Sequence, residues 1–409
     1  MANLLMSRIY FFIPLKEVKN DYAKGLDGGV NINPPAYLKQ FGDSLKYQTL
    51  KELEADFYFF RDTDRKKIAL VHVNVFLLGY HPQEKSEKWN YYLAVGMDQG
   101  NQFKCVTNNQ EPLVTIHDII MLKSAFGESL NEEKPTLLSC KHKEKGFAQW
   151  FYNDVLKVVS GTRQNIKYEL PYSLTEVRIV NAGKIRPNAE NYNAEFSAKY
   201  FGKNGDSLRD ALGKDYPIIA YGLLHGRDNY HSLCINEIAT NLQHLYSDLV
   251  TERFYSVEKS LLFISTHYPF KYWREAKQTF DNGITFNFAE LSNLWEICIE
   301  IYKDQQMKVC QHIVESEKDP VLIRKEIARM VKYFNDKHCH IYELDEKMRF
   351  MDETWRLNQM MAEIKERVEQ YSLAATTEKT WAISFIALAV TVMSFLLMLF
   401  NSIRFFVSF

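Results

Sequence analysis

Cysteine is scarce in this sequence: six residues are scattered over 409 positions, with no CxxC pair and no regular spacing. This pattern excludes a disulfide framework and is typical of buried thiols in a reducing compartment. Cys140 and His142 offer two metal ligands, and the His-Cys-His segment 338–340 offers two more. A zinc site needs four ligands in two matched halves, and neither segment has a matching half. We therefore expect no metal ion.

An excess of charge of one sign is missing too. The 50 lysines and arginines are balanced by 51 acidic residues. No global field attracts the whole protein to nucleic acid, so any basic binding site must be local.

The motifs of several enzyme classes are absent. There is no GxxxxGK[ST] phosphate loop, no HExxH, no GxSxG and no glycine-rich dinucleotide fingerprint. Each motif is hard to replace within its own class. We therefore expect no catalytic residue and no cofactor.

A signal peptide is also not evident. Arg8 precedes an apolar run at 9–15, but that run is short and no small-x-small cleavage site follows it. Pro14 and the aromatic residues of the run favour a first strand, and we expect a body that is not exported.

One long hydrophobic run is present at residues 381–400, which read WAISFIALAVTVMSFLLMLF without a charge. As a helix this run would be roughly 30 Å long, the thickness of a bilayer's hydrocarbon core. We predict a single transmembrane helix with a short tail, 401–409. Basic residues before the run outnumber Arg404 after it, which favours the inner (cytoplasmic) membrane with the body in the cytoplasm. A buried core helix is the alternative.

Residues 1–205 are predicted to form an α+β cytoplasmic domain. Segments 55–60 and 67–78 have strand character and flank a polar turn, and segments 91–97 and 103–106 flank another. Helices are expected at 115–125 and 147–159, and a further strand is expected at 174–180.

Residues 206–335 are predicted to form a mainly α domain, with a short buried strand at 216–221. Further helices are expected at 289–314 and from Asp319-Pro320 onward. Between these, apolar residues recur at helical spacing: Ile238, Leu242, Leu245, Leu249, Val257, Leu261 and Ile264.

Residues 336–380 are predicted to form a long helical stalk that continues unbroken into the hydrophobic run. No proline or glycine interrupts this segment. Met361, Ile364 and Val368 belong to an apolar stripe with three–four spacing, which favours a homo-oligomer joined along the stalk. The alternative is a helix that folds back on its own domain.

The densest histidine segment is 225–231, HGRDNYH. Arg227, Asp228 and His231 could bind a phosphodiester and transfer a proton. The segment resembles the arginine-to-histidine motif of the helical HEPN ribonucleases, which implies a membrane-tethered, nuclease-like hydrolase. Three residues separate Arg227 from His231, whereas that family has four to six. A polar loop is the alternative.

Aromatic and basic residues interleave in the segment 267–277. Aromatic faces next to cations are what single strands and nucleotides stack on. We predict that this segment binds a nucleotide or a single-stranded oligonucleotide; a packed domain interface is the alternative. The candidate ligand-binding residues are Tyr268, Lys271, Trp273, Arg274 and Lys277.

Small and hydroxylated residues follow one face of the hydrophobic run at steps of three and four: Ser384, Ala387, Thr391 and Ser394. Such residues favour close contact between helices in lipid, so they are candidate pore-lining residues. The alternative is that the hydroxyls bond to their own backbone.

The order of parts resembles the membrane effectors of bacterial antiphage and abortive-infection systems, among them the Hailong type: a cytoplasmic body, a helical neck and a short apolar terminus. The resemblance implies a self-associating, tail-anchored effector that forms a pore or disrupts and depolarises the membrane, with the body gating it in response to a ligand. A passive tail-anchored adaptor and the nuclease-like hydrolase are the alternatives, and the lipid bilayer is the expected partner.

Overall fold

The computed structural model describes most of the chain, and the residues it describes are 3–60, 68–82, 89–98, 104–105, 116–130, 138–140, 146–161, 171–181, 216–226, 230–232, 238, 244–246, 252–265, 287–316, 325, 328 and 342–407. The chain divides into two compact units. Unit 1 comprises Met1–Tyr302 and Cys339–Trp355, and unit 2 comprises Lys303–His338 and Arg356–Phe409.

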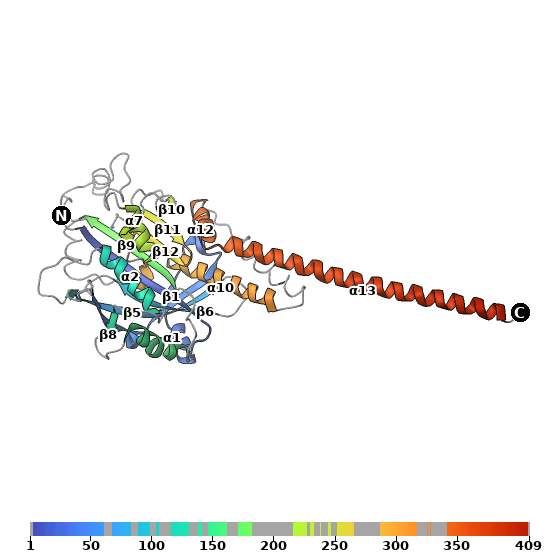
Figure 1. Cartoon of the computed structure of the whole chain (residues 1–409). Helices are drawn as coiled ribbons and strands as arrows, with labels where there is room; N and C mark the ends of the chain where they lie inside the picture. Colours follow the sequence, from blue (N-terminus) through green and yellow to red (C-terminus); the bar gives the residue numbers. More distant parts are fainter. Residues whose placement is uncertain are drawn as a thin grey trace. The chain divides into compact units, whose positions relative to one another are not determined.

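A mixed β-sheet is the centre of unit 1, with the strand order β10-β11-β12-β9-β1-β6-β5-β3-β2 (Figure 1). Neighbouring strands are antiparallel except for β9 and β12, which are parallel. Three short strands lie off this path: β4 (Ala55–Phe60) and β7 (Lys104–Cys105) pair with β5, and β8 (Leu138–Cys140) pairs with β4. The main strands are β1 (Asn3–Leu15), β2 (Val30–Ile32), β3 (Gly42–Thr49), β5 (Ile68–Pro82), β6 (Asn90–Asp98), β9 (Tyr172–Asn181), β10 (His244–Tyr246), β11 (Glu252–Val257) and β12 (Ser260–Ser265).

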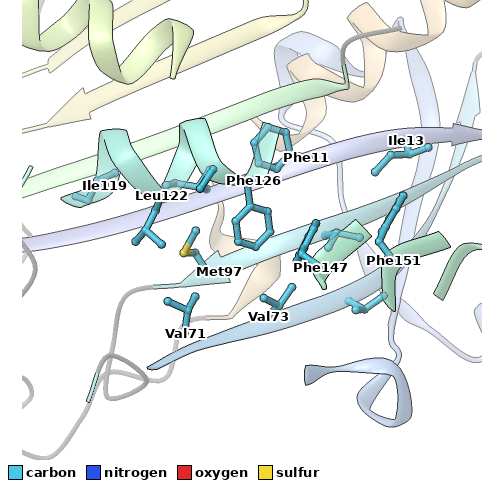
Figure 2. Packing of buried hydrophobic residues seen from close by; sticks show 14 of the residues in the cluster. Phe11, Ile13, Val71, Val73, Met97, Ile119, Leu122, Phe126, Phe147 and Phe151 are labelled. Atoms are coloured by element: carbon cyan, nitrogen blue, oxygen red, sulfur yellow. The ribbon is translucent and has the colours of Figure 1, made fainter. Parts of the chain in front are cut away.

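One face of the sheet forms the main hydrophobic core. Successive residues of a strand point to opposite faces, so Ile9, Phe11 and Ile13 of β1 share this face. Figure 2 shows Phe11 beside Phe126, whose ring stacks on it with the ring centroids 5.8 Å apart. Most helical residues of this core come from α2 (Ile116–Leu130), α3 (Phe147–Trp150) with its π-helical continuation η3 (Phe151–Leu156), α4 (Lys157–Ser160) and α7 (Tyr216–His225).

The opposite face is rich in aromatic side chains. Phe288 packs against Tyr10 and Phe76, with ring centroids 5.1 and 4.1 Å apart. Trp295 packs edge-on against Tyr80. Phe288 belongs to η5 (Phe288–Glu290), and Trp295 lies in the first turn of α10 (Leu294–Ser316). Helix α12 (Tyr342–Thr354) covers the same face through Lys347, whose Nζ lies 4.5 Å from the ring centroid of Phe254. The remaining elements of unit 1 are α1 (Asn20–Asp27), η1 (Ala36–Leu38), η2 (Lys51–Leu53) and η4 (Tyr230–Ser232).

The predicted mainly α middle domain is wrong. Residues 252–265 form the β11–β12 hairpin, and β12 joins the N-terminal sheet through β9. The predicted strand at 216–221 is instead the start of helix α7. The proposed boundaries after residues 205 and 335 lie outside the described residues, as does the helix expected at Asp319-Pro320.

The stalk is not one unbroken helix. α12 ends at Thr354, and α13 (Leu357–Val407) begins three residues later. Between them Arg356 adopts a left-handed backbone with φ of 58°. Four residues separate this break from Met361 of the apolar stripe.

The predicted transmembrane helix is corrected as well. Residues 381–400 are part of α13, drawn in Figure 1 as one long helix. Among the described residues, no helix combines the length and the apolarity that crossing a membrane requires. The inner-membrane localisation that depended on this helix is withdrawn with it.

Candidate functional site

The predicted ligand-binding segment cannot be placed. Tyr268, Lys271, Trp273, Arg274 and Lys277 all lie outside the described residues. Arg227 and Asp228 of the histidine-rich segment also lie outside them, whereas His225 ends α7 and His231 lies in the short turn η4. Nucleotide binding at 267–277 therefore stays a prediction.

No metal site is found within the described part of the chain, where no group of three His, Cys, Asp or Glu side chains could hold an ion. His72 comes nearest, because its Nδ1 lies 2.7 Å from Asp56 and its Nε2 lies 3.2 Å from Glu54. Hydrogen bonding of the His72 ring to Glu54 and to Asp56 raises the pKa of His72, against the opposing effect of burial. Both ring nitrogens face carboxylates, so the group is an ion-pair cluster.

The three candidate oligomerisation residues, Met361, Ile364 and Val368, are buried within the single chain. Close to them, Arg367 Nη1 donates to Glu315 Oε1 at 3.0 Å, which ties α13 to the end of α10 within unit 2. An interface between copies at these residues would have to replace contacts that the chain already makes. Oligomerisation along the stalk therefore stays a prediction.

The candidate pore-lining residues lie in the exposed part of α13. Ser384, Ala387, Thr391 and Ser394 are all exposed. Thr391 Oγ1 donates to the carbonyl oxygen of Ala387 at 2.8 Å, so this hydroxyl bonds to its own helix, as one sequence alternative expected. The large apolar residues around them are exposed too, with 73% of Phe385 accessible to solvent.

A separate candidate site is a cavity in the described part of unit 1. It has a volume of about 220 Å³ and lies where α2, the end of α7, the start of β9 and the β11–β12 turn meet. The residues that matter for its chemistry are Lys123, Ser173, His225, Glu258, Lys259 and Ser260.

Lys123 lies on α2 and is only 4% exposed. Its ammonium group donates to the carbonyl oxygens of Leu223 and Leu224, each at 2.8 Å, and to Ser260 Oγ at 3.2 Å. The two carbonyls belong to the last turn of α7, where helix carbonyls lack intrahelical partners. Lys123 thus caps α7 from the side.

Two serines extend this network. Ser260 Oγ lies 2.7 Å from the carbonyl oxygen of Leu224 and therefore donates its proton there. Ser173 Oγ lies 2.8 Å from Ser260 Oγ and donates to it, since the Ser260 proton is already used. The parallel pairing of β9 with β12 places the two serines opposite each other.

Burial strongly affects the charge state of Lys123. Removal from water lowers the pKa of its ammonium group to about 7. All three of its hydrogen-bond acceptors are neutral, and none of the described carboxylates pairs with it. The cavity is therefore bordered by a buried cation that has no acidic partner in the described part of the chain.

The remaining ionisable groups lie around the cavity. His225 is exposed at the end of α7. Lys259 sits in the tight β11–β12 turn at φ of 62°, with its Nζ 5.8 Å from the ring centroid of Tyr172. Glu258, the neighbouring turn residue, is exposed and is the only carboxylate among the described lining residues.

Gly226 allows α7 to end this close to α2. Its φ of 59° is left-handed, and a Cβ at this position would lie 3.0 Å from Lys123 Cγ. Glycine avoids both the backbone strain and the crowding.

A second buried charge cluster bridges three strands on the opposite face. Arg8 of β1 lies 3.8 Å from Asp98 of β6 and 3.6 Å from Glu176 of β9. Tyr10 donates to Asp98 Oδ2 at 2.7 Å, and Ser292 donates to Glu176 Oε1 at 3.1 Å. Because opposite charges are paired here, this cluster is a structural feature of the sheet.

The sequence analysis missed the Lys123 site, although the sequence contained a signal. Lys123 is a single cation in the otherwise apolar stretch 119–126 of a helix, Ile-Ile-Met-Leu-Lys-Ser-Ala-Phe. A charge at such a position is rarely left without a specific partner. Its serine partners could not be foreseen, because 252–265 was taken for helix.

Comparison with known proteins gives no relative from which a function could be transferred: no protein-family model, curated protein or solved structure matches this chain.

Proposed function

We propose that this chain is a self-associating protein, and that the apolar C-terminal part of α13 joins its copies into a helical bundle. The supporting observation is a set of large apolar side chains that are exposed on this helix: Trp381, Ile383, Phe385, Ile386, Leu388, Val390, Val392, Met393 and Met398.

These side chains surround the helix. With 3.6 residues per turn, positions 381, 386 and 398 point in three different directions. A helix that is apolar on all sides is normally covered on all sides. A single partner helix covers one side only, so several neighbours are required.

Copies of this chain fit that requirement. The segment 381–394 contains no charged residue, so identical helices can lie side by side without like charges meeting. Ser384, Ala387 and Thr391 give one side of the helix small residues that allow close approach. Each fully covered large apolar side chain contributes about 1.5–3 kcal/mol, so a handful per copy offsets an association cost of about 4–15 kcal/mol.

The test is the mass of the full chain in solution, measured by light scattering after gel filtration. We expect a defined multiple of the chain mass. The double variant Ile386→Lys/Met393→Lys places two charges on one side of the exposed segment and should shift the mass toward that of one chain.

The matched control is Gln359→Lys/Gln370→Lys, which adds the same charges at exposed positions in the polar part of α13. The control should keep the wild-type mass. A wild-type chain that is monomeric at every concentration contradicts the proposal, as does one that binds lipid vesicles as a monomer.

A further inference from the structure

The cavity beside Lys123 presents an unbalanced charge. A buried ammonium group is costly unless it is paired, because neutral acceptors replace only part of its hydration. Lys123 has three neutral acceptors and, among the described residues, no carboxylate partner. Capping α7 explains the hydrogen bonds, but it does not explain why a cation borders an open cavity.

A second basic residue, Lys259, lies at the cavity border, and Glu258 is the only carboxylate among the described lining residues. The serine network adds polarity without charge, since both hydroxyl protons are used within the protein. The cavity therefore attracts negative charge.

We propose that this cavity binds a small oxyanion, a carboxylate or phosphate group, which supplies the negative charge that Lys123 lacks. Lys123 stabilises the anion from within the protein, and Lys259 and His225 contact it from the cavity border. The proposal concerns unit 1 alone and is independent of self-association through α13.

The size of the cavity limits the ligand. Its volume of about 220 Å³ corresponds to roughly seven water molecules at about 30 Å³ each. Sites for drug-sized ligands measure about 300–1,000 Å³. Inorganic phosphate or a short carboxylic acid fits, whereas a whole nucleotide does not fit inside.

Binding should also take up a proton. The lowered pKa of Lys123 means that part of the protein holds a neutral amine near pH 7. An anion favours the ammonium form, so protonation and binding support each other. His225, Glu258 and Lys259 are the other titratable groups that line the cavity, and the variants below remove Glu258 and Lys259 separately.

The experiment measures the thermal unfolding of the full chain with inorganic phosphate or with acetate, against sodium chloride of equal ionic strength. We expect at least one oxyanion to raise Tm above the chloride value in a saturable manner. Calorimetric titration of that anion near pH 7 in buffers of different ionisation enthalpy should show proton uptake.

Three variants locate the site. Lys259→Gln should weaken binding about tenfold, because it removes a charged hydrogen-bond donor. Glu258→Gln should strengthen binding, because it removes the carboxylate. Lys24→Gln, an exposed lysine on α1, is the charge-matched control and should leave the affinity unchanged.

Lys123→Met should abolish both binding and proton uptake. If this variant does not fold, the opposite effects of Lys259→Gln and Glu258→Gln decide the question. If neither phosphate nor acetate raises Tm above the chloride value, the proposal is wrong. It is also wrong if Lys24→Gln and Lys259→Gln lose affinity equally.

Discussion

At the scale of single residues, two buried charge sites contrast with each other. Arg8 lies between two carboxylates, Asp98 and Glu176, on neighbouring strands. The partners of Lys123 among the described residues are all neutral. Arg8 is paired with carboxylates within the fold, whereas Lys123 has a cavity beside its charge. This difference in partners is why we assign ligand binding to Lys123 and a structural role to Arg8.

The Arg8 cluster gives a prediction about pH. Burial raises the pKa of Asp98 to about 6, against the opposing effects of the Tyr10 hydrogen bond and of Arg8. Between about pH 4 and pH 6 the folded protein thus binds a proton that the unfolded chain has released. The contribution of Asp98 to the free energy of unfolding therefore falls by on the order of 3 kcal/mol as pH rises across that window. Above about pH 6 this contribution no longer changes with pH.

Asp98→Asn tests this prediction, because asparagine keeps an acceptor for Tyr10 and does not titrate. We expect the stability of the variant relative to wild type to increase from pH 4 to pH 6. Urea unfolding at a series of pH values measures the difference. A difference that is flat across this window would show that Asp98 is ionised throughout.

At the scale of secondary-structure elements, the junction between α12 and α13 gives a second prediction. Arg356 is exposed and left-handed, a conformation that costs a non-glycine residue roughly 1–2 kcal/mol. Arg356→Gly should therefore stabilise the protein by up to about 1 kcal/mol, after the greater freedom of glycine in the unfolded chain is deducted.

The control applies the same change inside the helix. Ala362 is exposed on α13, and Ala362→Gly should destabilise by about 1 kcal/mol. The two glycine variants should thus shift the midpoint of thermal unfolding in opposite directions. Equal destabilisation by both would mean that the junction at Arg356 has no strain to relieve.

The sequence predicted some elements well and others badly, for physical reasons. β4 was predicted at its observed bounds because an aromatic-rich run ends there at a polar turn. The β11–β12 hairpin was mistaken for a helix. Its apolar residues Val257, Leu261 and Ile264 follow steps of four and three that imitate a helix, although a step of four also fits a strand. Its turn, Glu258-Lys259, lacks the glycine or asparagine that usually marks a hairpin.

The site was less predictable than the strands. Lys123 stands out in its own helix, but its partners come from α7, β9 and β12, which are distant in sequence. Two of these elements were assigned to the wrong type or domain. Without the β9–β12 pairing, no sequence pattern brings Ser173 and Ser260 together.

At the scale of the whole molecule, the sheet crosses the boundary that the sequence indicated near residue 205. β12 pairs with β9, and the aromatic face of β1 and β5 is covered by Phe288 and the first turns of α10. A fragment of residues 1–205 therefore lacks both the neighbour of β9 and the cover of Tyr10, Phe76 and Tyr80. We predict that this fragment does not fold cooperatively.

A fragment of residues 1–355 provides the comparison. It retains all described strands and helices of unit 1, including α12, whose Lys347 Nζ lies 2.8 Å from Glu296 Oε1 of α10. Exposing the aromatic face costs about 1.5–3 kcal/mol for each fully buried side chain, and a few such losses equal the 5–15 kcal/mol that stabilises a typical domain. Fragment 1–355 should give a sigmoidal urea transition with near-ultraviolet circular dichroism from packed aromatic rings, and fragment 1–205 should give neither. If fragment 1–205 instead unfolds cooperatively with native aromatic signals, the residues up to 205 form a domain of their own, and β12 and α10 are additions to a sheet that does not need them.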